Sequence, residues 1–238
     1  MKNVLAISSS KVGNSGYLEK AAPMIGEFLG NHKRNIALIP FAFAGNDTSS
    51  LTAAVQAALA QLPYIINGVN KSNAAALISN ADAIMVSGGN TFKLLHNLYE
   101  YNLIELIQQK INSGTPYIGW SAGANLTGKT ICTTNDMPII EPKSFAALNI
   151  FPFQINPHYY NISIEGFHGE TRDERLREFL ILNTSAKIVC LPEGTALQLK
   201  NDMLSFIGIT NGVVMYCKDG DVKKEELSPH SDCSHLME

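Results

Sequence analysis

The 238-residue sequence predicts an α/β fold in which helices cover a doubly wound, mostly parallel sheet. Short apolar runs alternate with segments of helical periodicity over residues 1–125, which is typical of parallel strands joined by crossover helices. Hydrophobic residues make up 45% of the chain, enough for a sizeable core, and we expect a single domain over residues 1–238. In such folds the ligand site lies at the carboxyl ends of the strands.

Composition and spacing place the strands and helices of the first half. Each expected strand is a short apolar run bounded by polar residues, glycine or proline, and these runs are Val4–Ile7, Ile36–Ile39, Tyr64–Ile66, Ala83–Val86 and Tyr117–Ile118. Between them, apolar side chains recur at helical spacing. The resulting helices are expected at residues 18–29, 48–61 and 74–78, and from Phe92 to about Ile111.

The pattern changes after residue 128. A buried strand is expected at Ile188–Leu191, and an amphipathic helix opens at Glu170 and runs to about Leu182. Beyond these, apolar runs separated by Asn-Gly and Asp-Gly turns are typical of antiparallel strands, at residues 196–199, 204–209 and 213–216. The last ten or so residues are polar, and we expect them to be loosely held.

Charge and cysteine content narrow the functional classes. The formal net charge is −3, which argues against nucleic acid or an anionic membrane as a partner. The sequence has no signal peptide pattern and no apolar run of the roughly 20 residues that a membrane helix needs. Four cysteines without close pairs argue against a zinc or redox site. We therefore expect a soluble, cytoplasmic protein with reduced thiols.

The segment Gly119-Trp-Ser-Ala-Gly123 follows the last strand of the first half and matches the G-x-S-x-G pattern of a nucleophile elbow. There a strand turns sharply into a helix and leaves the serine, here Ser121, at the apex. The turn needs neighbours with little or no Cβ. The backbone N–H of Ala122 is then placed to donate to a developing oxyanion. Such a pattern also arises by chance, but the apolar strand ahead of it favours the elbow.

A second glycine-rich turn, Gly88-Gly89-Asn90, follows the preceding strand and leads into a helix. Glycines at the carboxyl end of a strand allow bare backbone to approach a ligand, and Asn is a common helix cap. An ordinary capped turn explains this segment when taken alone. Because it neighbours the elbow on the next strand, we regard it as a candidate source of the second oxyanion donor.

A nucleophilic serine needs a base, usually histidine held by a carboxylate. Of the six histidines, His158 follows a proline that limits the backbone freedom of its loop, and His168 lies in a glycine-flanked loop as a candidate substrate contact. Asp136 and Glu193 both lie in turns at the ends of apolar segments. Either carboxylate can orient an imidazolium, and the choice between them stays open.

Five motifs together resemble the peptidase E family of α-aspartyl dipeptidases. In chain order they are Gly119-Trp-Ser-Ala-Gly-Ala-Asn125, Cys132-Thr-Thr-Asn-Asp-Met-Pro-Ile139, Phe153-Gln-Ile-Asn-Pro-His158, Gly169-Glu-Thr-Arg172 and Leu191-Pro-Glu-Gly194. The resemblance runs from the first strand to about Gly220. It implies a flavodoxin-like, three-layer fold similar to class I glutamine amidotransferases. It also implies a serine peptidase that removes N-terminal aspartate from dipeptides and a few tripeptides, with no metal or cofactor.

Carried over by motif, the resemblance makes Ser121 the nucleophile and His158 the base. It allows either Asp136 or Glu193 as the third member. Asp136 ranks slightly ahead as an essential residue, and Glu193 stays open as the geometric partner of His158. The family's oxyanion donors match Gly88, Gly89 and Ala122. For the substrate, the motif match singles out Arg172, because a guanidinium can pair bidentately with a carboxylate. Asn90 and His168 are further candidate substrate contacts. The chain departs from the family at Ser87, usually glycine, and at Thr195-Ala196, usually Asn-Trp.

Two alternatives share these motifs. One is a cyanophycinase-like exopeptidase, which acts on β-linked aspartyl polymers. The other is a non-catalytic binding protein that keeps the amidotransferase-like fold. A broken triad would favour the binding protein, whereas here the serine, the histidine and both acids are present. The expected partners are small peptides, and the sequence does not indicate an oligomeric state.

Overall fold

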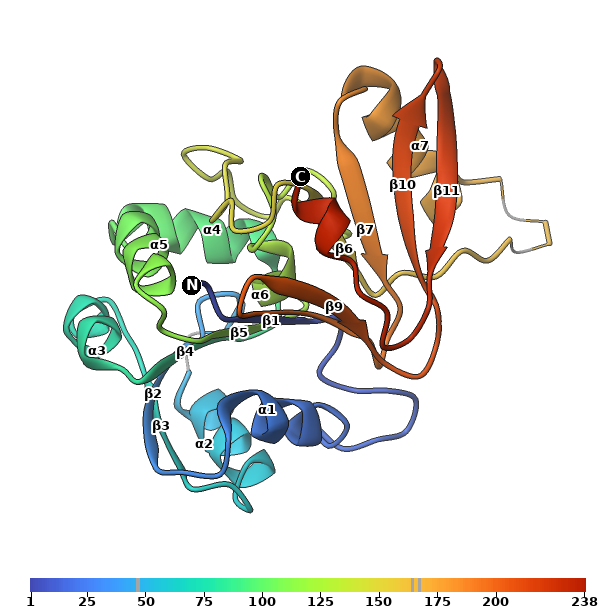
Figure 1. Ribbon diagram of the computed structural model, residues 1–238. Helices are drawn as coiled ribbons and strands as arrows, with labels where there is room; N and C mark the ends of the chain where they lie inside the picture. The colour runs from blue at the N-terminus through green and yellow to red at the C-terminus, as the bar shows by residue number, and fades with distance from the viewer. Residues whose placement is uncertain (46–47, 164, 167) are drawn as a thin grey trace.

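The computed structural model describes residues 1–45, 48–163, 165–166 and 168–238 (Figure 1). Within these ranges, a seven-stranded sheet has the order β3-β2-β4-β5-β1-β8-β9. Its parallel strands are β1 (Val4–Ile7), β2 (Arg34–Ile39), β3 (Tyr64–Gly68), β4 (Ala83–Val86) and β5 (Tyr117–Trp120). The antiparallel β8 (Ala196–Lys200) and β9 (Met203–Ile207) extend it beyond β1. The predicted mostly parallel sheet is confirmed.

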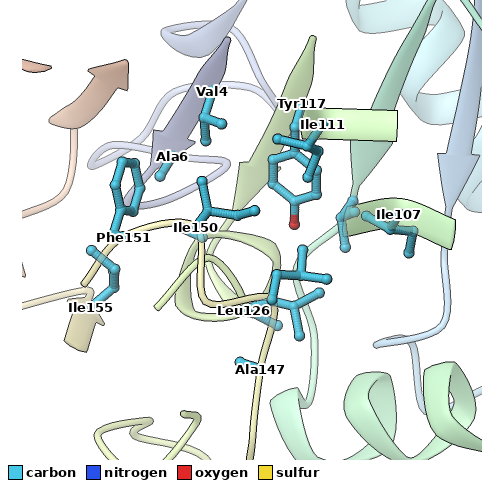
Figure 2. Packing of buried hydrophobic residues seen from close by; sticks show 14 of the residues in the cluster. Val4, Ala6, Ile107, Ile111, Tyr117, Leu126, Ala147, Ile150, Phe151 and Ile155 are labelled. Carbon is cyan, nitrogen blue, oxygen red and sulfur yellow. The ribbon is translucent and has the colours of Figure 1, made fainter. Parts of the chain in front are cut away.

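Helices lie on both faces of this sheet (Figure 1). One face carries α1 (Ala21–Leu29) and α2 (Ser49–Ala58), and the other carries α3 (Ala74–Asn80), α4 (Thr91–Glu100) and α5 (Ile104–Asn112). Successive side chains of a strand point to opposite faces, so the same strand packs against both layers. On β5, Ile118 packs in the α1–α2 layer, whereas Tyr117 lies with Ile107 and Ile111 of α5 (Figure 2).

The predicted helix from Phe92 to Ile111 is wrong in one respect, because the segment forms two helices. α4 ends at Glu100 and α5 begins at Ile104. Between them Asn102 has φ 54°, a left-handed conformation that asparagine tolerates better than most residues. Apolar residues continue across the break and stay buried, as Leu98 and Leu103 do. The periodicity of the sequence therefore conceals the change of direction.

A second, four-stranded sheet stands beside the first and has the order β11-β10-β7-β6 in the described chain (Figure 1). Its strands are β6 (Gln154–Pro157), β7 (Lys187–Leu191), β10 (Gly212–Lys218) and β11 (Asp221–Leu227). β6 and β7 are parallel, and the other pairs are antiparallel. α7 (Arg172–Leu182) covers this sheet through Leu176 and Leu180. The sequence predicted strands at β7 and β10 but neither β6 nor β11.

The expectation of a loosely held C-terminus is wrong. Residues Ser234–Met237 form a 3-10 helix beside β9, and Cys233 and Leu236 are buried. The Cys233 N–H donates to the Leu204 carbonyl at 2.7 Å, which ties this end to the central sheet. Two isolated apolar side chains hold the C-terminal segment against the core, but they form no periodic pattern from which the sequence could predict a helix or a strand.

Candidate active site

Ser121 occupies a strained turn between β5 and the short helix α6 (Ala122–Asn125). Its φ and ψ are 54° and −112°, which is unusual for a residue with a side chain and is typical of functional turns. A Cβ at Gly119 would lie 2.2 Å from the Gly123 carbonyl oxygen, and a Cβ at Gly123 would lie 2.3 Å from that of Val86. Both glycines are therefore required for α6 to turn back so closely against β4 and β5.

His158 lies directly against the serine. Oγ of Ser121 is 2.8 Å from Nε2 of His158, and Nδ1 of the same imidazole is 3.0 Å from Oε1 of Glu193. The side chains of His158 and Glu193 are 39% and 49% exposed, so the pair faces solvent while the serine side of the imidazole is covered. The hydroxyl, imidazole and carboxylate thus form a continuous array of the kind used in nucleophilic catalysis.

The pairing of β6 with β7 explains why the histidine and the glutamate meet. The parallel register places Pro157 opposite Leu191, so both chains leave the sheet at the same edge. After Leu191, the turn carrying Glu193 is closed by Thr195, whose hydroxyl and N–H both donate to the Pro192 carbonyl, at 2.7 and 3.2 Å. Thr195, one of the positions at which the sequence departs from the family, therefore contributes to the turn that presents the carboxylate.

Asp136 lies at the start of α4. Its Oδ2 accepts hydrogen bonds from the Thr91 N–H at 2.7 Å, from the Thr91 hydroxyl at 2.6 Å and from the Thr134 hydroxyl at 3.2 Å. A carboxylate is favoured there because helix N-terminal N–H groups carry partial positive charge. The hydrogen bond to the imidazole belongs to Glu193, the alternative that the sequence left open. Whether activity requires Asp136 stays a prediction.

The glycine turn after β4 packs against the elbow. A Cβ at Gly88 would lie 3.0 Å from the Ser121 Cβ, and one at Gly89, where φ is 136°, would lie 2.3 Å from the Ala42 carbonyl oxygen. Asn90 caps α4 by accepting from the Lys93 N–H at 3.0 Å. Its amide nitrogen donates to the Met137 carbonyl at 2.8 Å. Both ends of the Asn90 side chain are thus engaged, and its role in substrate binding remains a prediction.

Arg172 is the first residue of α7 and stands over the Tyr160 ring, with its guanidinium carbon 5.6 Å from the ring centroid. Among the described residues, nothing bonds its buried Nη1. Burial lowers the pKa of this guanidinium. The start of α7 is fixed by a capping box, in which the Thr171 side chain accepts from the Glu174 N–H and the Glu174 side chain accepts from the Thr171 N–H. A buried polar atom without a hydrogen-bond partner is costly. The role of Arg172 in binding a substrate carboxylate stays a prediction.

A pocket of about 280 Å³ surrounds Arg172 and is formed by the segment that leads from β6 into α7. Tyr160, Ile162, Glu170 and Arg175 contribute to its walls. His168 belongs to the same segment and is exposed. Arg172 and His168 both lie on the chain that follows His158, and the residues that line the pocket do not include Ser121, His158 or Glu193.

Sequence reasoning missed a polar cluster directly after His158. The Tyr159 hydroxyl donates to Asp173 at 2.6 Å, and Lys224 of β11 donates to the same carboxylate at 2.8 Å. Burial, aided by the bond to Asp173, raises the pKa of Tyr159 to about 12. This cluster joins the end of β6 to α7 and β11. Its members lie far apart in the sequence, so no local pattern indicates the contact.

Two negative findings apply to the described ranges. None of the helices there is long and apolar enough to cross a membrane. No group of three or more His, Cys, Asp or Glu side chains is arranged to hold a metal ion in that part of the chain.

Comparison with known proteins relates this chain to peptidases. The model of Peptidase family S51 matches residues 4–207. Peptidase E of Haemophilus influenzae strain Rd is 48% identical over 210 residues, covering 87% of this chain and 96% of the relative. Peptidase E of Shewanella sp. strain ANA-3 is 44% identical over 236 residues, covering 99% of this chain and 98% of the relative.

Two crystal structures share the fold at lower sequence identity. A protein described as a peptidase E from Listeria monocytogenes EGD-e has a TM-score of 0.67 at 23% identity and covers 88% of this chain and 100% of its own. A peptidase from an acI-B1 Actinobacterium has a TM-score of 0.68 at 18% identity, and the match covers 98% of this chain and 96% of that peptidase. These matches confirm the predicted flavodoxin-like α/β fold class.

Proposed function

Because the chain belongs to peptidase family S51, we propose that it is a serine dipeptidase that removes aspartate from the N-terminus of short peptides. The observation that carries this proposal is the array from Ser121 through His158 to Glu193, with contacts of 2.8 and 3.0 Å. Those distances are within the range needed for a base to take the proton of an attacking hydroxyl.

The chemistry of the array follows from its geometry. Oγ of Ser121 attacks the peptide carbonyl while Nε2 of His158 accepts the hydroxyl proton, and Glu193 stabilises the resulting imidazolium. The imidazolium then donates that proton to the departing amine, which leaves an acyl-enzyme. Water deprotonated by His158 hydrolyses the ester and restores the serine. The strained backbone of Ser121 supports this role because it holds the hydroxyl at the apex of the turn.

The tetrahedral oxyanion needs preorganised donors beside Ser121. We assign this role to the backbone N–H of Ala122, which opens α6, and to the turn at Gly88 and Gly89. The assignment is supported by the 3.0 Å approach of a Gly88 Cβ to the Ser121 Cβ, since only bare backbone fits there without displacing its neighbour. No cofactor is needed for this reaction, because the chain supplies the nucleophile, the base and the oxyanion donors.

Selectivity for aspartate is assigned to Arg172, with His168 and Asn90 as further candidate contacts. The unpartnered, buried Nη1 of Arg172 supports this assignment. A substrate carboxylate would form charge-assisted hydrogen bonds with the guanidinium, whereas the amide of asparagine offers an acceptor without the charge.

We place this activity in the cytoplasm, with small peptides as partners rather than nucleic acid or membranes. The four free cysteines support a reducing environment, because two of them are buried and none is paired in the described chain. The net charge of −3 provides no basic excess for binding a polyanion.

A panel of X-Leu dipeptides that differ only in the N-terminal residue tests the proposal. We expect kcat/KM for Asp-Leu to exceed that for Asn-Leu and Ala-Leu by about tenfold or more, the equivalent of one charged hydrogen bond. β-Asp-Arg serves as the comparison substrate, because a cyanophycinase-like enzyme would prefer it. Equal hydrolysis across the panel, or preference for β-Asp-Arg, would overturn the assigned specificity.

A further inference from the structure

Ser8 follows β1 and is completely buried at the junction of the two sheets. Its hydroxyl accepts a hydrogen bond from the His158 N–H at 2.9 Å and donates one to the Leu191 carbonyl at 2.7 Å. Its own N–H donates to the Thr195 carbonyl at 2.9 Å. One residue directly after β1 is therefore bonded to the histidine and to both sides of the turn that carries Glu193.

The residue before Ser8 is bonded to the nucleophile. The Ser121 N–H donates to the Ile7 carbonyl at 3.1 Å. Two consecutive residues at the end of β1 thus hold the backbones of Ser121 and His158, which come from different sheets. The distance from the hydroxyl to the imidazole depends on how these two chains are placed relative to each other, and Ser8 is the link on the histidine side.

The conformation of His158 makes that link important. Its φ is 51°, a left-handed conformation that is uncommon for a residue with a side chain and that the surrounding contacts must hold in place. Without the Ser8 hydroxyl, the His158 N–H loses the acceptor that helps impose this conformation. The Tyr159 N–H still donates to the Leu191 carbonyl at 3.0 Å, so β6 and β7 stay paired while the imidazole is freed to move.

We propose that Ser8 is a positioning residue that holds His158 and the Glu193 turn in the geometry required for proton transfer from Ser121. This inference rests on the proposed function, since it concerns the same array. Ser8 does not touch the reacting atoms. Its effect should therefore appear in the chemical step and not in the binding of the peptide.

Ser9 provides a matched control. It is 4% exposed, and its hydroxyl donates locally to the Lys11 carbonyl at 2.7 Å. Ser8→Ala and Ser9→Ala therefore remove the same group from adjacent buried positions, but only the first touches the array. The measurements are the rate at which a fluorophosphonate modifies Ser121, kcat and KM for Asp-Leu, and the thermal unfolding midpoint.

We expect Ser8→Ala to slow fluorophosphonate modification and to lower kcat by about 10- to 100-fold, the effect of a small misplacement of a catalytic group. KM should stay within about twofold of wild type, because peptide binding is assigned to Arg172, His168 and Asn90, whereas Ser8 bonds to His158, Leu191 and Thr195. Ser9→Ala should react at the wild-type rate. Equal modification rates for Ser8→Ala and Ser9→Ala would overturn the inference.

The two readouts separate this inference from the proposed function. If wild type is modified at Ser121 and Ser8→Ala is slowed, yet no dipeptide is cleaved, the specificity fails and the positioning role stands. If Asp-Leu is cleaved and Ser8→Ala matches Ser9→Ala, only the positioning role fails. Should Ser8→Ala not fold, Ser8→Cys is compared with Ser9→Cys, because a thiol fills the space but is a weak donor and acceptor. A slower reaction of Ser8→Cys is then expected, and equal rates overturn the inference.

Discussion

Nδ1 of His158 lies 3.0 Å from Oε1 of Glu193, and the two residues are 35 positions apart in the sequence. Glu193→Gln keeps the shape of the side chain but removes the charge that favours the imidazolium. We expect kcat for Asp-Leu to fall by at least about a hundredfold with KM little changed, since the imidazolium forms only during the reaction. Steady-state kinetics measure this. A Glu193→Gln enzyme with wild-type kcat would remove Glu193 from the mechanism.

Asp136 should act through α4. Asp136→Ala leaves the Thr91 N–H without its 2.7 Å acceptor, so we expect the free energy of unfolding to fall by about 1 kcal/mol. Activity should fall as well, because the Gly88–Asn90 turn sits at that helix end. Asp136→Asn keeps an acceptor oxygen and should retain more of both properties. Denaturant unfolding and kinetics on both variants check this. Lost activity at unchanged stability would instead indicate a direct part in the chemistry.

The elbow can be tested through its packing. Gly123→Ala would place a Cβ 2.3 Å from the Val86 carbonyl oxygen, so β4 or α6 must shift. We expect this variant to lose at least about 1–3 kcal/mol of unfolding free energy. Gly16→Ala is the control, because the nearest atom to its Cβ is the mobile end of the Glu19 side chain at 3.3 Å. Similar unfolding midpoints for the two variants would refute the close-packed elbow.

Arg172 is tested by substrate choice. Arg172→Met keeps much of the apolar stem but removes the charge, so the preference for Asp-Leu over Asn-Leu should shrink by about 1.5–3 kcal/mol, or roughly 10- to 150-fold. Arg175→Met is the control, since Arg175 also lines the pocket but its Nε lies 3.9 Å from Glu170 and its side chain is exposed. The quantity measured is the ratio of kcat/KM for the two dipeptides. An unchanged ratio in Arg172→Met would redirect the search to His168 and Asn90.

The sequence alone was sufficient to predict those parts of the site whose geometry depends on neighbouring residues in the chain. The elbow at Ser121 was predicted because its glycines are required within a few residues of the serine, where an added Cβ would lie 2.2–2.3 Å from a carbonyl oxygen. The strands of the central sheet were predicted because each is a short apolar run. His158 stood out through the proline before it, although its left-handed conformation was not visible.

What the sequence could not predict depends on distant partners. The parallel pairing of β6 with β7 aligns Pro157 with Leu191, and this register brings Glu193 to His158. Asp136 instead accepts the Thr91 N–H at the start of α4, a contact between distant residues that no local pattern indicates. The break at Asn102 lies in an unbroken apolar pattern, so only tertiary packing reveals it. Ser8 looks like an ordinary turn residue until the second sheet brings His158 to it, 150 positions away.

The central claim is that Ser121 is the nucleophile, and the most direct measurement is kcat/KM for Asp-Leu in Ser121→Ala. The substitution removes one hydroxyl at a turn and leaves no core cavity, so the variant should unfold at the wild-type temperature. We expect kcat/KM to fall by at least about a thousandfold, because only binding and the oxyanion donors remain to accelerate the reaction. A folded Ser121→Ala protein with kcat/KM within about tenfold of wild type, a difference of 1.4 kcal/mol, would contradict the account.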